Sequence, residues 1–144
     1  MAARLTPSAC RAGRAILGWS TKDLAQEAQV SPATIHLLEA GRPFHQATAQ
    51  RIIVAFGRRG VEITNGRGAG ARRVFEQMYP HEVEGEWRVL VKWAHGDPVE
   101  LLRLDAARRL ANEAQQRGYE LLASALTAEV HRAERYARDA RSST

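Results

Sequence analysis

Hydroxyl and basic side chains gather between residues 20 and 51, and their types suit the binding of phosphate groups. Ser20 and Ser31 each stand just before a short amphipathic segment, where a helix N-cap is expected. Hydroxyls and backbone N–H groups at helix N-termini donate hydrogen bonds to phosphate oxygens, and nearby cations add attraction. The two serines could instead serve as helix caps alone, and both roles can coexist. The candidate phosphate-binding residues are Thr21, Lys22, Ser31, Thr34, Arg42 and Arg51.

Two short helices would position these groups. Ser20 followed by Asp23 has the form of a capping box, which predicts a helix over about 21–28. Ser31 is followed by a proline, which suits the first helical position because its missing N–H costs nothing there. This second helix should end at residue 40, because Gly41 can adopt the left-handed cap conformation.

The short connection between these helices predicts a helix-turn-helix, in which small and aliphatic side chains press the two helices together. The inward-facing residues would be Leu24, Ala25, Val30, Ile35 and Leu38. This geometry leaves the N-terminal half of the second helix projecting outward. The DNA major groove is about 12 Å wide and accepts one α-helix, so this half could enter it.

The stretch LGWSTKDLAQEAQVSPATIHLLEAGR resembles the Cro/repressor (XRE) family of helix-turn-helix transcriptional regulators. It shares the Leu-Ala pair in the first helix, Val-Ser before the second, Thr-Ile within it and the exit at Glu39 and Gly41. The resemblance covers about residues 8–64. It implies a bundle of four or five helices, sequence-specific binding of double-stranded DNA, a two-fold dimer on a near-palindromic operator, and a bacterial or phage regulator.

The resemblance also assigns the residues that would face the base edges. By register with the family these are Pro32, Ala33, His36 and Leu37. Ala33 and Leu37 could pack on thymine methyl groups, and His36 could hydrogen-bond a base or a phosphate, but none makes a bidentate base contact. Phosphate contacts should therefore dominate, and about six neutralised phosphates per dimer predict a log–log salt slope of about −5. Gln29 holds the turn position that is usually glycine, so a positive φ is expected there.

Further helices are expected over about 7–17, ended by Gly18, and over about 46–58. Val61 to Ile63 and the following Asn65-Gly66 predict a small hairpin or an extended flap. The glycine-rich run after them lacks the GKS or GKT ending of a phosphate-binding loop, so a flexible junction is favoured. The expected organisation is a DNA-binding domain over 1–64, a glycine- and arginine-rich linker over 65–80 and a helical dimerisation or partner-binding domain over 81–141.

The C-terminal part is expected to be helical, which makes the predicted fold class all-α. Residues 85–95 are ambiguous, because apolar residues fit both a helical stripe and the alternation of a strand. Leu90 and the stop at His95-Gly96 favour a helix. A longer helix is expected from Pro98 to Gly118, followed by a last helix carrying Leu122 to Ala137, and the two should fold back as an antiparallel hairpin.

The positive charge is concentrated in the N-terminal half of the chain. Up to Arg73 there are eleven Lys and Arg against four Asp and Glu, a net charge of +7, whereas the remainder carries ten against twelve, a net charge of −2. A basic half suits a polyanion, although solvated arginine faces are also common. The chain has no run of about 18 apolar residues and no secretory signal pattern, so a cytoplasmic location and no membrane partner are expected.

Catalytic and metal-binding patterns are not evident. The single cysteine, Cys10, is expected to be a small buried residue, and the histidines form no ligand cluster, so no cofactor or metal ion is expected. His81 with the glutamates at 82, 84 and 86 could do acid–base work, but such a run is more typical of a solvated surface. An enzyme is therefore not expected.

These patterns favour a dimeric, sequence-specific DNA-binding transcriptional regulator. The alternative is a protein-interaction module, such as an antitoxin or anti-activator, whose C-terminal helices capture a protein partner. The apolar outer surface of the second helix of the helix-turn-helix favours this alternative, and the net charge of the N-terminal half disfavours it.

Overall fold

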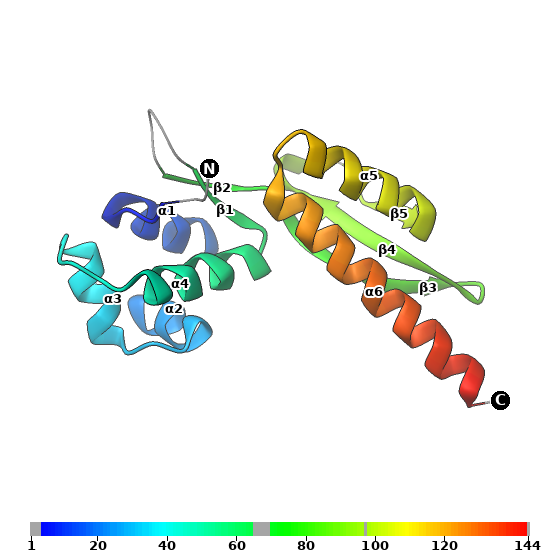
Figure 1. Cartoon of the computed structure of the whole chain (residues 1–144), viewed down its shortest axis with the longest axis horizontal. Coiled ribbons are helices and arrows are strands. Elements are labelled where there is room, and N and C mark those ends of the chain that lie inside the picture. The colour runs from blue at the N-terminus through cyan, green and yellow to red at the C-terminus, as the bar shows by residue number, and fades with distance from the viewer. Residues whose placement is uncertain (1–3, 65–69, 97, 144) are drawn as a thin grey trace. The chain divides into compact units, whose positions relative to one another are not determined.

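The computed structural model describes residues 4–64, 70–96 and 98–143 (Figure 1). The chain divides into two compact units, 1–74 and 75–144, and each is described by itself. The described residues form six α-helices and five strands in two antiparallel sheets. The all-α class that the sequence predicted is therefore wrong, and the fold is of the α+β class.

The first unit contains the four helices that the sequence indicated. Their bounds are α1 Pro7–Leu17, α2 Thr21–Ala28, α3 Pro32–Glu39 and α4 Gln46–Arg58. Two of the helix ends have a glycine as their local cause: Gly18 takes a left-handed φ of 66° after α1, and Gly41 takes 81° just after α3. The predicted helix-turn-helix is thus present as α2 and α3, which pack together.

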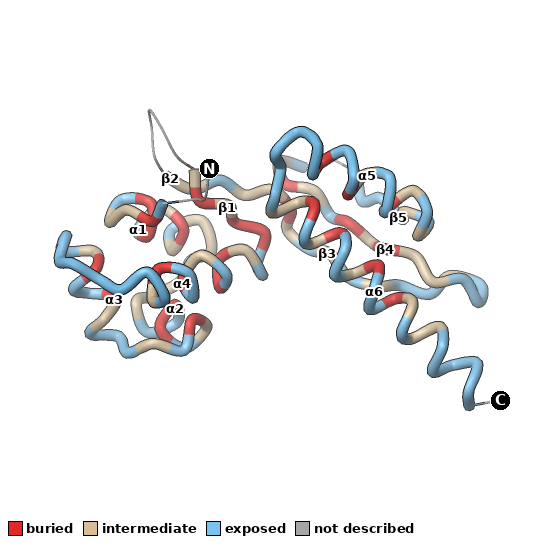
Figure 2. The backbone as a smooth tube through the Cα atoms, in the orientation of Figure 1, coloured by how far each residue is buried: buried red, intermediate tan, exposed pale blue. Residues whose placement is uncertain are grey.

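An apolar core joins these helices. Leu24, Ile35, Leu38 and Phe56 are fully buried, and Figure 2 shows the buried positions on the inner sides of the helices. Cys10 is buried within this core, which confirms the expectation of a small buried residue. The inward contacts predicted from the sequence therefore hold the helix-turn-helix together.

A hairpin completes the first unit, which decides between the small hairpin and the extended flap that the sequence left open. Strand β1 Val61–Thr64 pairs antiparallel with β2 Gly70–Arg73, and both strands contact α1. Val61 and Ile63 are buried in the core. The predicted Asn65-Gly66 turn lies outside the described residues. Within the range expected as a linker, residues 70–73 and 75–80 lie in strands.

The second unit is a sheet covered by two helices. Its elements are β3 Phe75–Val83, β4 Glu86–Trp93, the 3₁₀ turn η1 Ala94–Gly96, β5 Glu100–Arg103, α5 Leu104–Gln116 and α6 Glu120–Ser142. The strand order is β3-β4-β5, with both pairs antiparallel. Helices α5 and α6 pack against each other and both contact the sheet, on the same face (Figure 1).

The helix favoured over 85–95 is wrong, because residues 86–93 of this segment form β4 and the 3₁₀ turn η1 begins at Ala94. Val89 and Val91 are buried, and Trp87 contacts Tyr136 of α6, so the odd-numbered side chains face the helices. Leu90, which had favoured a helix, points to the other face and has cross-strand neighbours in β3 and β5. The apolar residues that were expected on one side of a helix therefore lie on the two opposite faces of a strand.

The predicted C-terminal domain of helices alone is also wrong. Residues 100–103 form β5, so the helix expected from Pro98 begins only at Leu104. The last two helices do exist and turn at Gly118, which takes a φ of 79°. Their apolar sides cover the sheet as well as each other.

Candidate nucleic-acid interface

The N-terminus of α2 is fixed by reciprocal hydrogen bonds. The Asp23 N–H donates to Ser20 Oγ at 3.0 Å, and the Ser20 N–H donates to Asp23 Oδ2 at 2.9 Å. The backbone hydrogen bond from Ser20 lowers the pKa of the Asp23 carboxyl below its usual value. This is the predicted capping box, so the Ser20 hydroxyl performs its capping role. Thr21 and Lys22 follow at the first turn of the helix, with Lys22 exposed.

The N-terminus of α3 is capped in the same manner. The Thr34 N–H donates to Ser31 Oγ at 3.2 Å, and the two hydroxyl oxygens lie 2.8 Å apart. Both hydroxyls are therefore engaged within the helix end. They lie at the exposed start of α3, next to Pro32 at its first position.

The outer side of α3 has the composition that the sequence register assigned. Pro32, Ala33, His36 and Leu37 are all exposed, and the inner side of the helix is buried in the core. Leu37 is the most exposed large apolar side chain among the described residues, at 55%. A leucine this exposed on a helix with a buried inner side is available for contact with another molecule.

A contact that the sequence did not indicate joins α2 to this surface. Thr21 Oγ1 lies 3.4 Å from His36 Nε2. The distance links a predicted phosphate-binding residue to a predicted base-reading residue, 15 positions later in the chain. No local sequence signal reports such a contact, because it depends on how α2 crosses α3.

The candidate cations lie on three different segments. Lys22 is exposed on α2, Arg42 is exposed in the loop after α3, and Arg51 is exposed on α4. Arg51 Nη1 donates a hydrogen bond to the backbone oxygen of Gln29 at 3.3 Å. Arg51 therefore holds the carbonyl of the turn between α2 and α3, in addition to any contact with phosphate.

Gln29 adopts the left-handed conformation that the sequence predicted, with a φ of 56°. An L-residue with a side chain is strained there, whereas glycine is not. We expect Gln29→Gly to raise the free energy of unfolding by about 0.5–1 kcal/mol, measured by chemical denaturation. The bond from Arg51 goes to the backbone and would be retained. The matched control is Gln26→Gly, which lies inside α2 and should lose about 1 kcal/mol, so a loss at both positions would contradict the strain.

An ion pair holds the C-terminal end of α3. Its basic partner, Arg14, was not among the functional residues predicted from the sequence. Arg14 Nε donates to Glu39 Oε1 at 2.7 Å, and Arg14 Nη2 donates to Glu39 Oε2 at 2.9 Å. Arg11 Nη1 adds a hydrogen bond to the Glu39 backbone oxygen at 2.8 Å. The glutamate of the Glu-x-Gly exit therefore fastens α3 to α1.

Burial, with the neighbouring Glu39 carboxylate, raises the pKa of the Cys10 thiol to about 12, so the thiol stays protonated at neutral pH.

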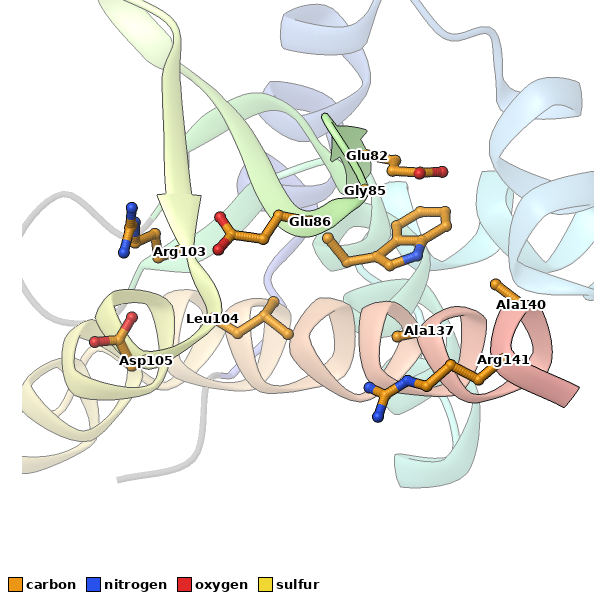
Figure 3. A pocket seen from close by; sticks show the side chains of 10 residues that line it. Glu82, Gly85, Glu86, Arg103, Leu104, Asp105, Ala137, Ala140 and Arg141 are labelled. Carbon is orange, nitrogen blue, oxygen red and sulfur yellow. The ribbon is translucent and has the colours of Figure 1, made fainter. Parts of the chain in front are cut away.

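A surface cleft of about 480 Å³ lies in the second unit, between the β3–β4 turn, the start of α5 and the end of α6 (Figure 3). Its lining includes the apolar side chains of Trp87 and Leu104 and the carboxylates of Glu86 and Asp105. Glu86 pairs with Arg88 at 3.2 Å, and Asp105 pairs with Arg109 at the same distance. Both carboxylates are therefore paired with arginines of the same unit.

Within the described ranges, no group of three or more His, Cys, Asp or Glu side chains could hold a metal ion. No helix in this part of the chain combines the length and apolar character needed to cross a membrane.

No protein-family model matches the chain, and no curated protein sequence matches it either. The resemblance to the Cro/repressor family therefore rests on the motifs between residues 8 and 64. A fold does not by itself determine a function, which depends on the chemistry of specific surface residues.

Proposed function

We propose that this chain is a transcriptional regulator that binds double-stranded DNA in a sequence-specific manner, with α3 in the major groove. The observation that carries the proposal is the geometry of α2 and α3. The inner side of α3 is buried, its outer side is exposed, and a short turn sets the angle between the two helices. A helix presented in this way fits the width of the major groove.

Phosphate contacts supply most of the binding energy in this proposal. The N-termini of α2 and α3 lie at the surface, and Lys22, Arg42 and Arg51 are exposed nearby on the same unit. The net charge of +7 up to Arg73 adds long-range attraction for a polyanion. Base recognition would come from van der Waals contacts of Ala33 and Leu37 with thymine methyl groups and from a hydrogen bond of His36.

A dimer follows from the weakness of this reading surface. Half-sites about 34 Å apart, bound together by a two-fold dimer, gain from the high effective concentration of the second half. We therefore propose a homodimer on an inverted repeat, in a bacterial or phage regulator that works in the cytoplasm without a cofactor or catalytic activity.

The test is genome-wide DNA occupancy of the intact protein and of the His36→Ala/Leu37→Ala variant. We expect sharp peaks that share an inverted-repeat motif and disappear in the variant. A matched control, His131→Ala/Val99→Ala, makes the same kinds of change at exposed positions of the second unit and should keep the peaks. Diffuse occupancy that the α3 variant leaves unchanged would reject sequence-specific reading by this helix.

A second candidate function is favoured by the exposure of Leu37. An apolar side chain beside Ala33 on a helix is also suited to a protein partner, as in an antitoxin or anti-activator whose C-terminal helices add a second contact. The variant Lys22→Ala/Arg42→Ala distinguishes the two functions. This variant should lose DNA binding in the first case and keep partner capture in the second.

A further inference from the structure

The sheet of the second unit has two unlike faces. Val89 and Val91 are buried on the face that α5 and α6 cover. On the opposite face, Tyr79 of β3 is 40% exposed and Leu101 of β5 is 41% exposed. We call this opposite side the open face. A sheet face with exposed aromatic and aliphatic side chains is a candidate contact surface.

The register arranges the open face in rows that run across the strands. Tyr79 is paired with Leu90, which is paired with Leu101, so one row is apolar. Two residues further along the strands, the cross-strand set is His81, Arg88 and Arg103. A rise of about 3.4 Å per residue puts the two rows about 7 Å apart. An apolar row thus runs beside a basic row.

The positive charge of the basic row is only partly neutralised by carboxylates of the described residues. Arg88 and Arg103 are direct cross-strand neighbours, and like charges in this relation destabilise a sheet. Arg88 pairs with Glu86 at 3.2 Å, and its Nε is buried without a hydrogen-bond partner. Within the described part of the chain, Arg103 has no ion-pair partner. An anion on this row would relieve the repulsion and bind the exposed guanidinium of Arg103.

A second copy of the chain fits this surface poorly. Packing two open faces about a two-fold axis along β4 would bring the basic row against itself. Packing them about an axis along the apolar row would bring the basic row against Lys92, which already pairs with Glu76 at 2.7 Å. The first arrangement places like charges in a desolvated interface, and the second removes the Lys92–Glu76 ion pair from water, so both cost binding energy. The charge pattern therefore favours a polyanion over self-association.

We propose that the open face binds single-stranded DNA. Phosphates would lie along Arg88 and Arg103, and an unstacked base would lie on the ring of Tyr79, supported by Leu90 and Leu101. A single strand supplies both groups, because its phosphates alternate with bases whose faces are free to stack. A duplex does not, since its bases are stacked on each other. The choice of DNA over RNA rests on the function proposed for the first unit, whereas the surface itself does not depend on it.

The experiment measures the fluorescence anisotropy of a labelled 12-nucleotide oligothymidine with the full chain. We expect Tyr79→Ala to weaken binding about tenfold through loss of stacking, and Tyr79→Trp to retain it. Arg103→Gln should lower the log–log salt slope by about 0.7, the value for one phosphate of a single strand. Matched controls are Tyr119→Ala, at a tyrosine that is 46% exposed, and Arg138→Gln on α6, and neither should change the affinity.

Each other outcome would overturn the proposal in a specific way. Equal affinity of the Tyr79→Ala variant and the unaltered protein would remove the stacking site. If Lys22→Ala/Arg42→Ala lost single-strand binding and Tyr79→Ala did not, the binding site for single-stranded DNA would lie on the first unit. Tighter binding of oligouridine RNA with the same sensitivity to Tyr79 would replace DNA by RNA. A change of molecular mass in Tyr79→Ala/Leu101→Ala, measured by light scattering without DNA, would identify the face as a self-association surface.

Discussion

Replacing both Lys22 and Arg42 with alanine is expected to weaken binding of a duplex operator about 100-fold or more at 0.15 M salt. Both side chains are exposed beside the helix-turn-helix, Lys22 on α2 and Arg42 after α3. In a dimer the variant removes four of about six neutralised phosphates, and with them the release of the bound counterions. The log–log salt slope should fall from about −5 to about −2, because each phosphate contributes about 0.9. Affinity measured over a series of salt concentrations checks both values.

The matched control for this variant is Arg117→Ala/Arg138→Ala. It removes the same total charge from exposed positions of the second unit. If net charge alone attracted DNA, the control would weaken binding as much as the variant does. An unchanged salt slope in Lys22→Ala/Arg42→Ala would contradict the assignment of these residues to phosphates. It would also favour protein capture as the function of this surface.

The first unit was predictable because its signals are local. Ser20 with Asp23 caps one helix, Ser31 caps the next, and Gly41 follows the end of the latter. Each signal acts within a single helical turn, so the sequence alone shows it. The positive φ of Gln29 was expected from the resemblance to the Cro/repressor family, because Gln29 holds the turn position that is usually glycine.

The second unit was not predictable to the same degree, because its apolar residues satisfy two periods at once. Trp87 and Val91 fit both a helical stripe and the alternation of a strand, so the pattern does not decide between the two. The difference lies in the partners of Leu90, which are Tyr79 on one side and Leu101 on the other. Such pairs join residues about ten positions apart, so they reflect the register of the sheet.

Some contacts within the candidate site could not be predicted from the sequence. The phosphate-binding and outward-facing residues were named from caps and register, but Arg14 was not, because its partner Glu39 is 25 positions away. The bond from Arg51 to Gln29 spans 22 positions and gave that arginine a structural partner. Side chains that hold one helix to another depend on the packing of the unit, which no short pattern reports.

Glu39→Ala is expected to lower the free energy of unfolding by about 2–3 kcal/mol. The side chains of Arg14 and Glu39 are only 20% and 11% exposed, so the variant leaves a partly buried guanidinium without its carboxylate. The matched control is Glu27→Ala, which breaks the exposed pair with Arg59 in the same unit and should cost less than about 1 kcal/mol. Chemical denaturation of both variants checks the difference, and equal losses would contradict a special role for the pair.

The double variant Arg14→Met/Glu39→Leu distinguishes a packing role from an electrostatic one. Removing both charges avoids the unpaired guanidinium, so much of the lost stability should return. The double variant should nevertheless bind duplex DNA less tightly than the unaltered protein. The bidentate pair fixes the exit of α3 relative to α1 through two hydrogen bonds, which apolar side chains cannot reproduce. Recovered stability with weakened DNA binding would identify Arg14 and Glu39 as positioning residues for α3. Full recovery of both stability and DNA affinity would show that the ion pair is not needed to position α3.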